Sequence, residues 1–567
     1  MKKIIYFFPT LVGAMLSMSS CSSDEDYSPA NPGDAIQFTA VTPQTRTVYE
    51  GPLKLNWVRG DLIGIYSAQA TKPEGADPEP YAPYQITEVI EGGDHDNHGE
   101  FKAQHNTNCL RWGSYNKHTF YAAYPSEHIM GHPGKNQADG EGVFQMKYIT
   151  HQLCSIDNNK TENTYATIPD MKNAYMAATN TITLTTPKND DHVLLNFRPI
   201  MTTLDITVTA GKTSEDVGTG IIPAPTTITG VSVILPKALK DGVFKYDVKD
   251  SCLLQGTVID KTKESIFITL AKDKDKYLRL NAGESVRFLA FLPPMPIDGT
   301  INNQAKIRIH TTGYQNYLIT LNGKLEQQSK INVPLPNFDP ENIQSNNWLS
   351  EIDDKVLVSS LSIPGAFNAV SMDGTGILQS SQASHLSITN LLNMGVRAFD
   401  VKDNAKLTSV IKEIEAFLKA EKNKNEFVLV RINNMQNVNN GVIPYQKPMT
   451  LGEARGKIVA VASEAAAEGI TQYPFTNAER VIEHLTAAAG NKNTLSITDC
   501  ATEKMTINEI AISNNKIYTH ITDTVNKGNT GVVMVPYACT PAVDKIAVQG
   551  DLLIQSIIDC NYKFLHK

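Results

Sequence analysis

The chain has 567 residues, a net charge of -8, 41% hydrophobic residues and 19% charged residues. These values are typical of a globular protein, exclude a largely disordered chain, and give no reason to expect a nucleic-acid partner. At roughly 150 residues per domain, the length predicts about three to four domains.

The amino terminus predicts export from the cytoplasm. Lys2 and Lys3 precede a mostly apolar run over residues 4–16, and small residues then lead to Cys21. This is the plan of a secretory signal peptide, and the apolar run is short for a membrane span. A signal that ends directly at a cysteine resembles the lipobox of bacterial lipoproteins. The resemblance implies removal of residues 1–20, a lipid on Cys21 and the outer membrane as a partner; an ordinary signal beside an incidental cysteine is the alternative.

Residues 21–34 are expected to form a linker. The run SSDED at 22–26 is acidic and serine-rich, so it stays solvated rather than joining a core. It also resembles the surface-export signal on lipoproteins of Bacteroides-type bacteria. That resemblance implies a surface-exposed lipoprotein of the outer membrane, within the cell envelope.

From residue 35 to residue 336 the chain predicts β structure. Short runs rich in Val, Ile, Thr and aromatic residues recur between Gly, Pro, Asn and Asp clusters. One or two β-sandwiches are therefore expected. The predicted strands lie at 63–66, 120–124, 181–184, 204–208, 228–235, 265–270, 286–292 and 306–310.

Four segments of this half resemble motifs of fimbrillin-like proteins. They are NWVRGDLIGIY at 56–66, FYAAYP at 120–125, VLLNFRPIMTTL at 193–204 and FLPP at 291–294. The resemblance implies two transthyretin-like β-sandwiches, at 35–200 and 201–336, of the kind used in fimbriae and surface adhesion. It also implies other fimbrillins as partners. Trp57, Gly60 and Tyr66 are expected to be structural residues.

One arginine is a candidate processing site. The resemblance implies that an Arg near the start of such a chain can be cleaved to free a strand groove for assembly, and Arg46 lies in QTRT at 44–47. A solvated surface arginine is the simpler alternative, because charged residues are mostly exposed.

After a polar linker at 337–347, the pattern changes to alternating strands and helices. Strands are expected at 395–401, 427–432, 458–462, 495–498 and 532–537, and helices at 407–418, 478–489, 507–525 and 552–560. The strand at 427–432 is apolar apart from Arg431. Repeated units with apolar strands predict a parallel sheet that is buried on both faces, in a barrel-like α/β domain over 348–567.

This domain resembles the X region of phosphatidylinositol-specific phospholipases C. The residues that carry the resemblance include Trp348, LSIPG at 361–365 and SITNLLNMGVRAFD at 387–400. The resemblance implies an irregular TIM-like barrel. It also implies a mechanism in which one His is the general base, a second His is the general acid and an Arg compensates the phosphate charge.

The residues that should carry this chemistry are changed. Phe367 stands at the position of the general base and Asn368 at that of the Asp that orients it. The segment with the second His is missing, because the residues after Val401 lead directly into a helix. Lys402 replaces the Arg and loses its two-point grip on phosphate, while Asp400 is retained. No residue is therefore predicted to be catalytic.

The leading hypothesis is a surface lipoprotein for adhesion or ligand binding, whose barrel has lost phospholipase catalysis. Its ligand would be another fimbrillin, a host molecule or glycan, or an inositol phosphate. A second hypothesis is an active phosphoric diester hydrolase with relocated groups, such as His385 with Asp400. A lone His is more often a surface or capping residue, and Asp373 is expected to be a solvated turn residue. A third hypothesis is a fimbrial tip or accessory subunit.

Neither a metal nor a cofactor is predicted. The sequence shows no GxSxG, HExxH, P-loop or paired-cysteine motif. Of the seven cysteines, the six beyond Cys21 are widely scattered, without metal-ligand spacing or the density of a disulfide scaffold. Their pairing is left open.

Overall fold

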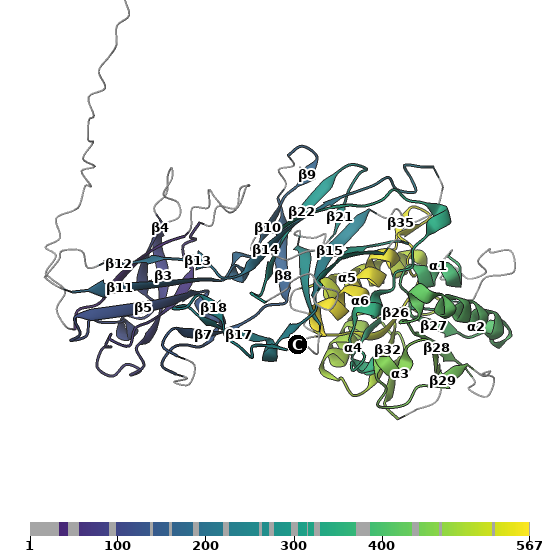
Figure 1. The fold of residues 1–567 in the computed structure, drawn as a ribbon. Coiled ribbons are helices and arrows are strands. Elements are labelled where there is room, and N and C mark those ends of the chain that lie inside the picture. Colours follow the sequence, from purple (N-terminus) through teal and green to yellow (C-terminus); the bar gives the residue numbers. More distant parts are fainter. Residues whose placement is uncertain are drawn as a thin grey trace, which may run out of the picture.

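The computed structural model describes residues 33–42, 56–89, 98–135, 140–157, 161–184, 192–218, 226–259, 263–271, 277–295, 304–314, 316–321, 329–369, 386–433, 441–463, 468–523 and 528–565. Sheets fill the first part of the chain and an α/β arrangement fills the last part, which confirms this predicted order (Figure 1). In these ranges, no helix combines the length and the apolar character that a membrane crossing needs.

A first β unit is built on one eight-stranded sheet of order β12-β1-β4-β3-β2-β5-β11-β13. Trp57 lies in its core, 3% exposed, with its ring edge-on to Phe101, Tyr124 and Phe197 at centroid distances of 5.3, 5.6 and 5.3 Å. Gly60 has a φ of 102°, a conformation that favours glycine. The strands are β1 (Gln37–Val41), β2 (Leu62–Tyr66), β3 (Tyr81–Val89), β4 (His98–Ala103), β5 (Lys117–Tyr124), β11 (Met176–Thr183), β12 (His192–Asn196) and β13 (Arg198–Pro199).

A second β unit has three main sheets around its own apolar core. One has the order β10-β8-β20-β15-β23-β24, with β21 also on β15; the others are β25-β14-β22-β9 and β18-β17-β7-β6. The strands are β6 (Ile129–Gly131), β7 (Val143–Lys147), β8 (His151–Ile156), β9 (Thr164–Tyr165), β10 (Thr167–Pro169), β14 (Thr202–Thr209), β15 (Thr227–Leu235), β17 (Val243–Asp247), β18 (Cys252–Leu253), β20 (Glu264–Ala271), β21 (Leu278–Arg279), β22 (Ser285–Leu292), β23 (Lys306–Thr311), β24 (Tyr317–Thr320) and β25 (Ser329–Pro334), with the small pair β16 (Ala238–Leu239) and β19 (Val258–Ile259).

The predicted boundary at residue 200 does not separate these sheets. Strand β8 pairs in parallel with β20, β9 pairs with β22, and β7 pairs with β17. Strands from residues 129–169 thus belong to sheets that are completed after residue 200. Alternating polarity predicts that a strand exists, but its partner is set by packing between residues far apart in the chain.

The last part of the chain is an α/β unit with an eight-stranded sheet of order β29-β30-β28-β27-β26-β33-β32-β31. All neighbouring strands are parallel and the central ones are buried, as their continuous apolar runs predict. The strands are β26 (Ser362–Ala366), β27 (Ala398–Val401), β28 (Val428–Ile432), β29 (Val442–Pro444), β30 (Ile458–Ala462), β31 (Ile470–Tyr473), β32 (Leu495–Asp499) and β33 (Gly531–Val535), followed by the hairpin β34 (Ala542–Val543) and β35 (Ile546–Ala547). Full closure into a TIM-like barrel, like the pair of transthyretin-like sandwiches, stays a prediction.

In the described part of this unit, six α-helices accompany the sheet: α1 (Ile388–Asn393), α2 (Asn404–Lys419), α3 (Leu451–Ala454), α4 (Ala478–Gly490), α5 (Ile507–Thr522) and α6 (Gly550–Phe564). Helix α6 is buried along its whole length, polar residues included. It packs on β26 and β33 of its own sheet and on β15, β20 and β23 of the second β unit (Figure 1). One helix therefore belongs to two cores.

The six cysteines whose pairing the sequence left open are free thiols, and all but Cys252 are buried. Burial raises the pKa of Cys154 and Cys560 to about 12, so both stay protonated at neutral pH.

Candidate functional site

Side chains from four strand ends meet at the carboxyl edge of the parallel sheet. Strand β26 leads into Phe367, β27 carries Asp400, β28 carries Arg431 and β32 ends at Asp499. In parallel α/β folds, functional residues collect at this edge because the connecting loops begin there. Phe367 and Asp400, which the phospholipase resemblance singled out, thus lie at the same edge.

Arg431 is held between two carboxylates. Its Nε lies 3.0 Å from Oδ1 of Asp400, and its Nη2 lies 2.8 Å from Oδ1 of Asp499. Asp400 is 1% exposed and Arg431 is 5% exposed, so this pairing takes place away from water. A guanidinium that already serves two carboxylates has little capacity left to bind a phosphate from solution.

The electrostatics follow from burial and pairing. Burial would lower the pKa of Arg431, but hydrogen bonds and charge from Asp400 and Asp499 raise it above the usual value. The pKa of Asp499 is raised, mainly by burial and against the opposing effect of Arg431. Arg431 therefore stays charged at neutral pH.

Phe367 fills the position at which the resemblance expects the general base. Its ring is 4% exposed, and its backbone N–H donates to the carbonyl of Val535 on β33 at 3.0 Å. Asn368 follows in the left-handed conformation, with a φ of 47°. A phenyl ring accepts no proton, so this position offers packing and a π face but no base.

Lys402 covers this group at the end of β27. Its Nζ lies 4.9 Å from the centroid of the Phe367 ring, 2.8 Å from Oε1 of Glu503 and 3.9 Å from Oδ2 of Asp400. The lysine thus contacts an aromatic face and two carboxylates. The cluster contains three carboxylates and two cationic side chains. This excess of negative charge disfavours the binding of a phosphate.

The structure does not test the remaining predicted site residues. Cys21, Arg46, Asp373 and His385 lie outside the described residues, so the pairing of His385 with Asp400 is untested. His484 on α4 stacks on Tyr473 at a centroid distance of 4.2 Å. Where the chain is described, no group of three His, Cys, Asp or Glu side chains is arranged to hold a metal ion.

Sequence reasoning missed Arg431 and Asp499 as members of the cluster. A signal was present, because Arg431 interrupts an otherwise apolar strand and a buried strand tolerates an arginine only when it is paired. Asp499 closes a short strand, where an acidic residue usually indicates a solvated turn.

A second buried cluster joins α6 to the second β unit. Nε2 of His310 lies 2.6 Å from Oγ of Ser232, and its Nδ1 lies 2.9 Å from Oδ1 of Asp559. The hydroxyl of Thr229 donates to Oδ2 of Asp559 at 2.8 Å. The order Ser–His–Asp matches that of a hydrolase triad, but Ser232 is 0% exposed and His310 is 2% exposed. A serine with no exposed surface is not accessible to a substrate. We therefore interpret these hydrogen bonds as contacts that hold α6 against the second β unit.

No family model matches the chain. It is 29% identical over 140 residues to a 1-phosphatidylinositol phosphodiesterase of Listeria monocytogenes, a match that covers 22% of this chain and 42% of that protein. The chain thus spans less than half the length of this curated relative. The similarity agrees with the phospholipase resemblance of the carboxy-terminal domain.

Solved structures fall into two groups. A mutant phosphatidylinositol-specific phospholipase C of Staphylococcus aureus is 17% identical, with a TM-score of 0.30 over 37% of this chain and 95% of that one. A candidate cell adhesion protein of Bacteroides uniformis is 16% identical, with a TM-score of 0.30 over 55% of this chain and 94% of that one. The chain is similar to both kinds of protein, as the two resemblances predict.

Proposed function

We propose that this protein is a surface lipoprotein for adhesion or ligand binding, and that its α/β unit does not hydrolyse phosphatidylinositol. The observation that carries the proposal is Phe367. It occupies the general-base position at the end of β26, buried and capped by Lys402. Proton transfer from a hydroxyl nucleophile needs an acceptor within hydrogen-bond reach, and this side chain has none.

The charges around Phe367 support the same conclusion. A phosphoryl-transfer site stabilises developing negative charge with cationic groups that are free to contact the phosphate. Here Arg431 is paired with Asp400 and Asp499, and Lys402 is paired with Glu503. Each of these cations already has a carboxylate partner, so a phosphodiester would compete with those carboxylates for them.

The test is a hydrolysis assay on the purified full chain. Vesicles containing phosphatidylinositol are incubated with the chain, with its Phe367→His/Asn368→Asp double variant, and with an active bacterial phospholipase C as the positive control. Neither form of the chain is expected to release inositol phosphate, because restoring the first position supplies neither the general acid nor the arginine. Metal-independent release by the unmodified chain, lost in the Asp400→Asn variant, would overturn the proposal.

The surface location is proposed from the amino terminus. Cys21 follows a signal-like segment and precedes the acidic run at 22–26. Labelling of growing cells with a radioactive fatty acid is expected to mark the protein, and the Cys21→Ser variant is expected to lose the label. Amino-terminal sequencing of the mature protein separates a start at Cys21 from a start just after Arg46. Protease added to intact cells then reports whether the chain is outside.

A further inference from the structure

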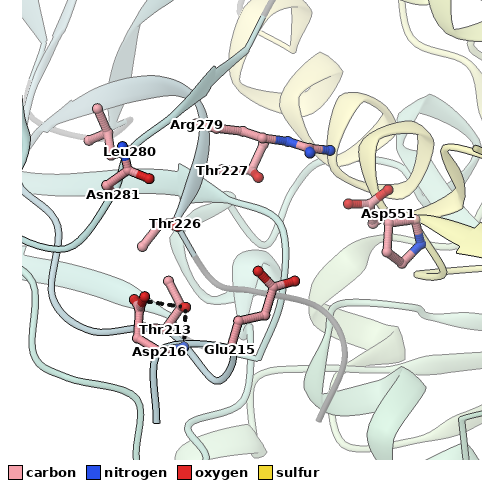
Figure 2. A pocket seen from close by; sticks show the side chains of 10 residues that line it. Thr213, Glu215, Asp216, Thr226, Thr227, Arg279, Leu280, Asn281 and Asp551 are labelled. Carbon is pink, nitrogen blue, oxygen red and sulfur yellow. Dashed lines mark hydrogen bonds between the residues drawn. The ribbon is translucent and has the colours of Figure 1, made fainter. Parts of the chain in front are cut away.

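A cavity of about 210 Å³ lies where the second β unit meets the amino-terminal end of α6. The second β unit supplies Glu215, Asp216 and Asn281 from loops and Arg279 from the end of β21, and the α/β unit supplies Asp551 with Pro541 (Figure 2). The cavity is lined by two parts of the fold and lies apart from the Asp400–Arg431 cluster. It is a separate candidate site.

The lining is polar and carries an excess of negative charge. Three carboxylates, those of Glu215, Asp216 and Asp551, stand against the single guanidinium of Arg279. Figure 2 shows the Glu215 and Asp551 side chains reaching into the space between the loops and the helix, with Arg279 extending toward Asp551. Asp216 is already engaged, because its Oδ2 accepts from the N–H and the hydroxyl of Thr213 at 2.9 and 3.0 Å. Glu215 and Asp551 are therefore the carboxylates available to a ligand.

Asp551 is the most informative residue of this lining. It is 6% exposed, and its Oδ1 has no hydrogen-bond partner among the described residues. Burial raises the pKa of this carboxyl group to about 6, against the lowering effect of backbone hydrogen bonds at the start of α6, of Arg279 and of the Thr312 side chain. A buried carboxylate oxygen without a donor is costly to maintain, and a donor supplied by a ligand would remove that cost.

We propose that this interdomain cavity binds a small organic cation through its ammonium group. The ammonium donates to Asp551, and Glu215 at the mouth supplies the second negative charge. A primary amine provides three N–H donors on a compact charge, which suits one buried and one exposed carboxylate. An anion is disfavoured by the surplus of carboxylates, and the described lining has no aromatic ring on which a sugar would stack.

The experiment is isothermal titration of the purified full chain with putrescine, which is small and carries two ammonium groups. 1,4-Butanediol has the same chain length without charge and serves as the matched ligand control. Saturable binding of one putrescine per chain, with no heat from butanediol, is the expected result. Equal binding of the two compounds, or no saturable binding of putrescine, would overturn the proposal.

Variants then locate the binding. Asp551→Asn keeps the size of the buried side chain and is expected to weaken binding by at least about tenfold. Glu215→Gln changes an exposed loop residue without risk to folding and is expected to weaken binding by about threefold to tenfold. Glu88→Gln, an exposed site on β3 of the first β unit, removes the same charge and is expected to leave binding unchanged. Equal effects of Glu215→Gln and Glu88→Gln would place the amine elsewhere and refute the assignment.

Discussion

Two buried arginines show how the α/β unit uses charge at the level of single residues. Arg397 is 0% exposed, pairs with Oε2 of Glu426 at 2.8 Å, and donates to the carbonyls of Leu392, Val396 and Asn346 at 2.6 to 2.8 Å. Arg431 pairs with Asp400 and Asp499. Both guanidinium groups are satisfied by the protein itself. The desolvation cost of each buried guanidinium is offset by contacts within the protein, without a ligand.

The first prediction concerns Arg431. Arg431→Met removes the guanidinium between Asp400 and Asp499 and leaves only the partly exposed Lys402 near them, so it is expected to lower the free energy of unfolding by about 3 kcal/mol. Denaturant unfolding followed by far-UV circular dichroism measures the change. Lys402→Met is the matched control. Because the Lys402 side chain is 41% exposed, its loss is expected to cost less than about 1 kcal/mol.

The second prediction concerns Glu264, the first residue of β20. It is 4% exposed, and burial raises its pKa from 4.5 to about 7 against the lowering effect of a hydrogen bond from the Leu239 N–H. Between these two pKa values the folded state holds a proton that the unfolded state has released. Stability is therefore lost as the pH rises from about 4.5 through 7.

Glu264→Gln removes this pH-dependent loss. Compared with the unmodified chain, the variant is expected to have a similar unfolding free energy at pH 4 and to gain up to about 3 kcal/mol at pH 8, since each pKa unit corresponds to about 1.4 kcal/mol. Unfolding midpoints measured at both pH values test this. A difference between the two proteins that does not change with pH would show that the pKa of Glu264 is the same in the folded and unfolded states.

At the scale of secondary-structure elements, α6 is the unusual member of the fold. Its buried face toward the second β unit includes Asp559 and Lys563, with the Lys563 ammonium 5.1 Å from the centroid of the Phe267 ring on β20. Asn561 binds the backbone of Ser362 on the other side, at 2.8 Å for each hydrogen bond. The helix is therefore fixed on both faces by specific polar contacts.

The third prediction is that His310 and Asp559 are energetically coupled across this junction. The variants His310→Gln and Asp559→Asn and their combination form a double-mutant cycle. Because the two side chains are in contact and buried, a coupling energy of about 1–3 kcal/mol is expected. His151→Gln combined with Asp559→Asn is the control. Nε2 of His151 on β8 lies 2.6 Å from the hydroxyl of Thr269, so a smaller coupling energy than that of His310 is expected for that pair.

Sequence periodicity predicted the positions of helices and strands better than it predicted their tertiary contacts. Ile458–Ala462 is a strand as expected, and the predicted helix at 552–560 extends to Gly550–Phe564. Its spacing could not show that Asp559 is buried, because that depends on a sheet more than 200 residues earlier in the chain. Motif order singled out Phe367 and Asp400 one by one, and the structure shows that both lie at the carboxyl edge of the parallel sheet. The Arg431–Asp499 pair depends on three-dimensional neighbours that no local pattern reports.

At the scale of the whole molecule, the second β unit and the α/β unit share a continuous interface. Besides α6, Glu351 is 8% exposed and lies 3.2 Å from Lys306 on β23 and 3.5 Å from Lys263. The ring of Tyr562 on α6 lies edge-on to His310 on β23, with the centroids 4.6 Å apart. These contacts predict that the two units do not unfold separately.

The fourth prediction is a single cooperative unfolding of these two units. A fragment of residues 337–567 would expose the α6 face that normally covers β15, β20 and β23, so it is expected to bind a hydrophobic dye and to aggregate. In the full chain, replacing Trp57 and Trp112 with Phe leaves the fluorescence of Trp348 as a probe of the α/β unit. A fluorophore attached to Cys252 reports on the second β unit. The two signals should change at the same denaturant concentration. Two separated transitions, or a soluble fragment without dye binding, would mean that α6 is held mainly by its own sheet. Coincident transitions would instead show that the α/β unit contributes to the stability of the second β unit, a role that requires no catalysis.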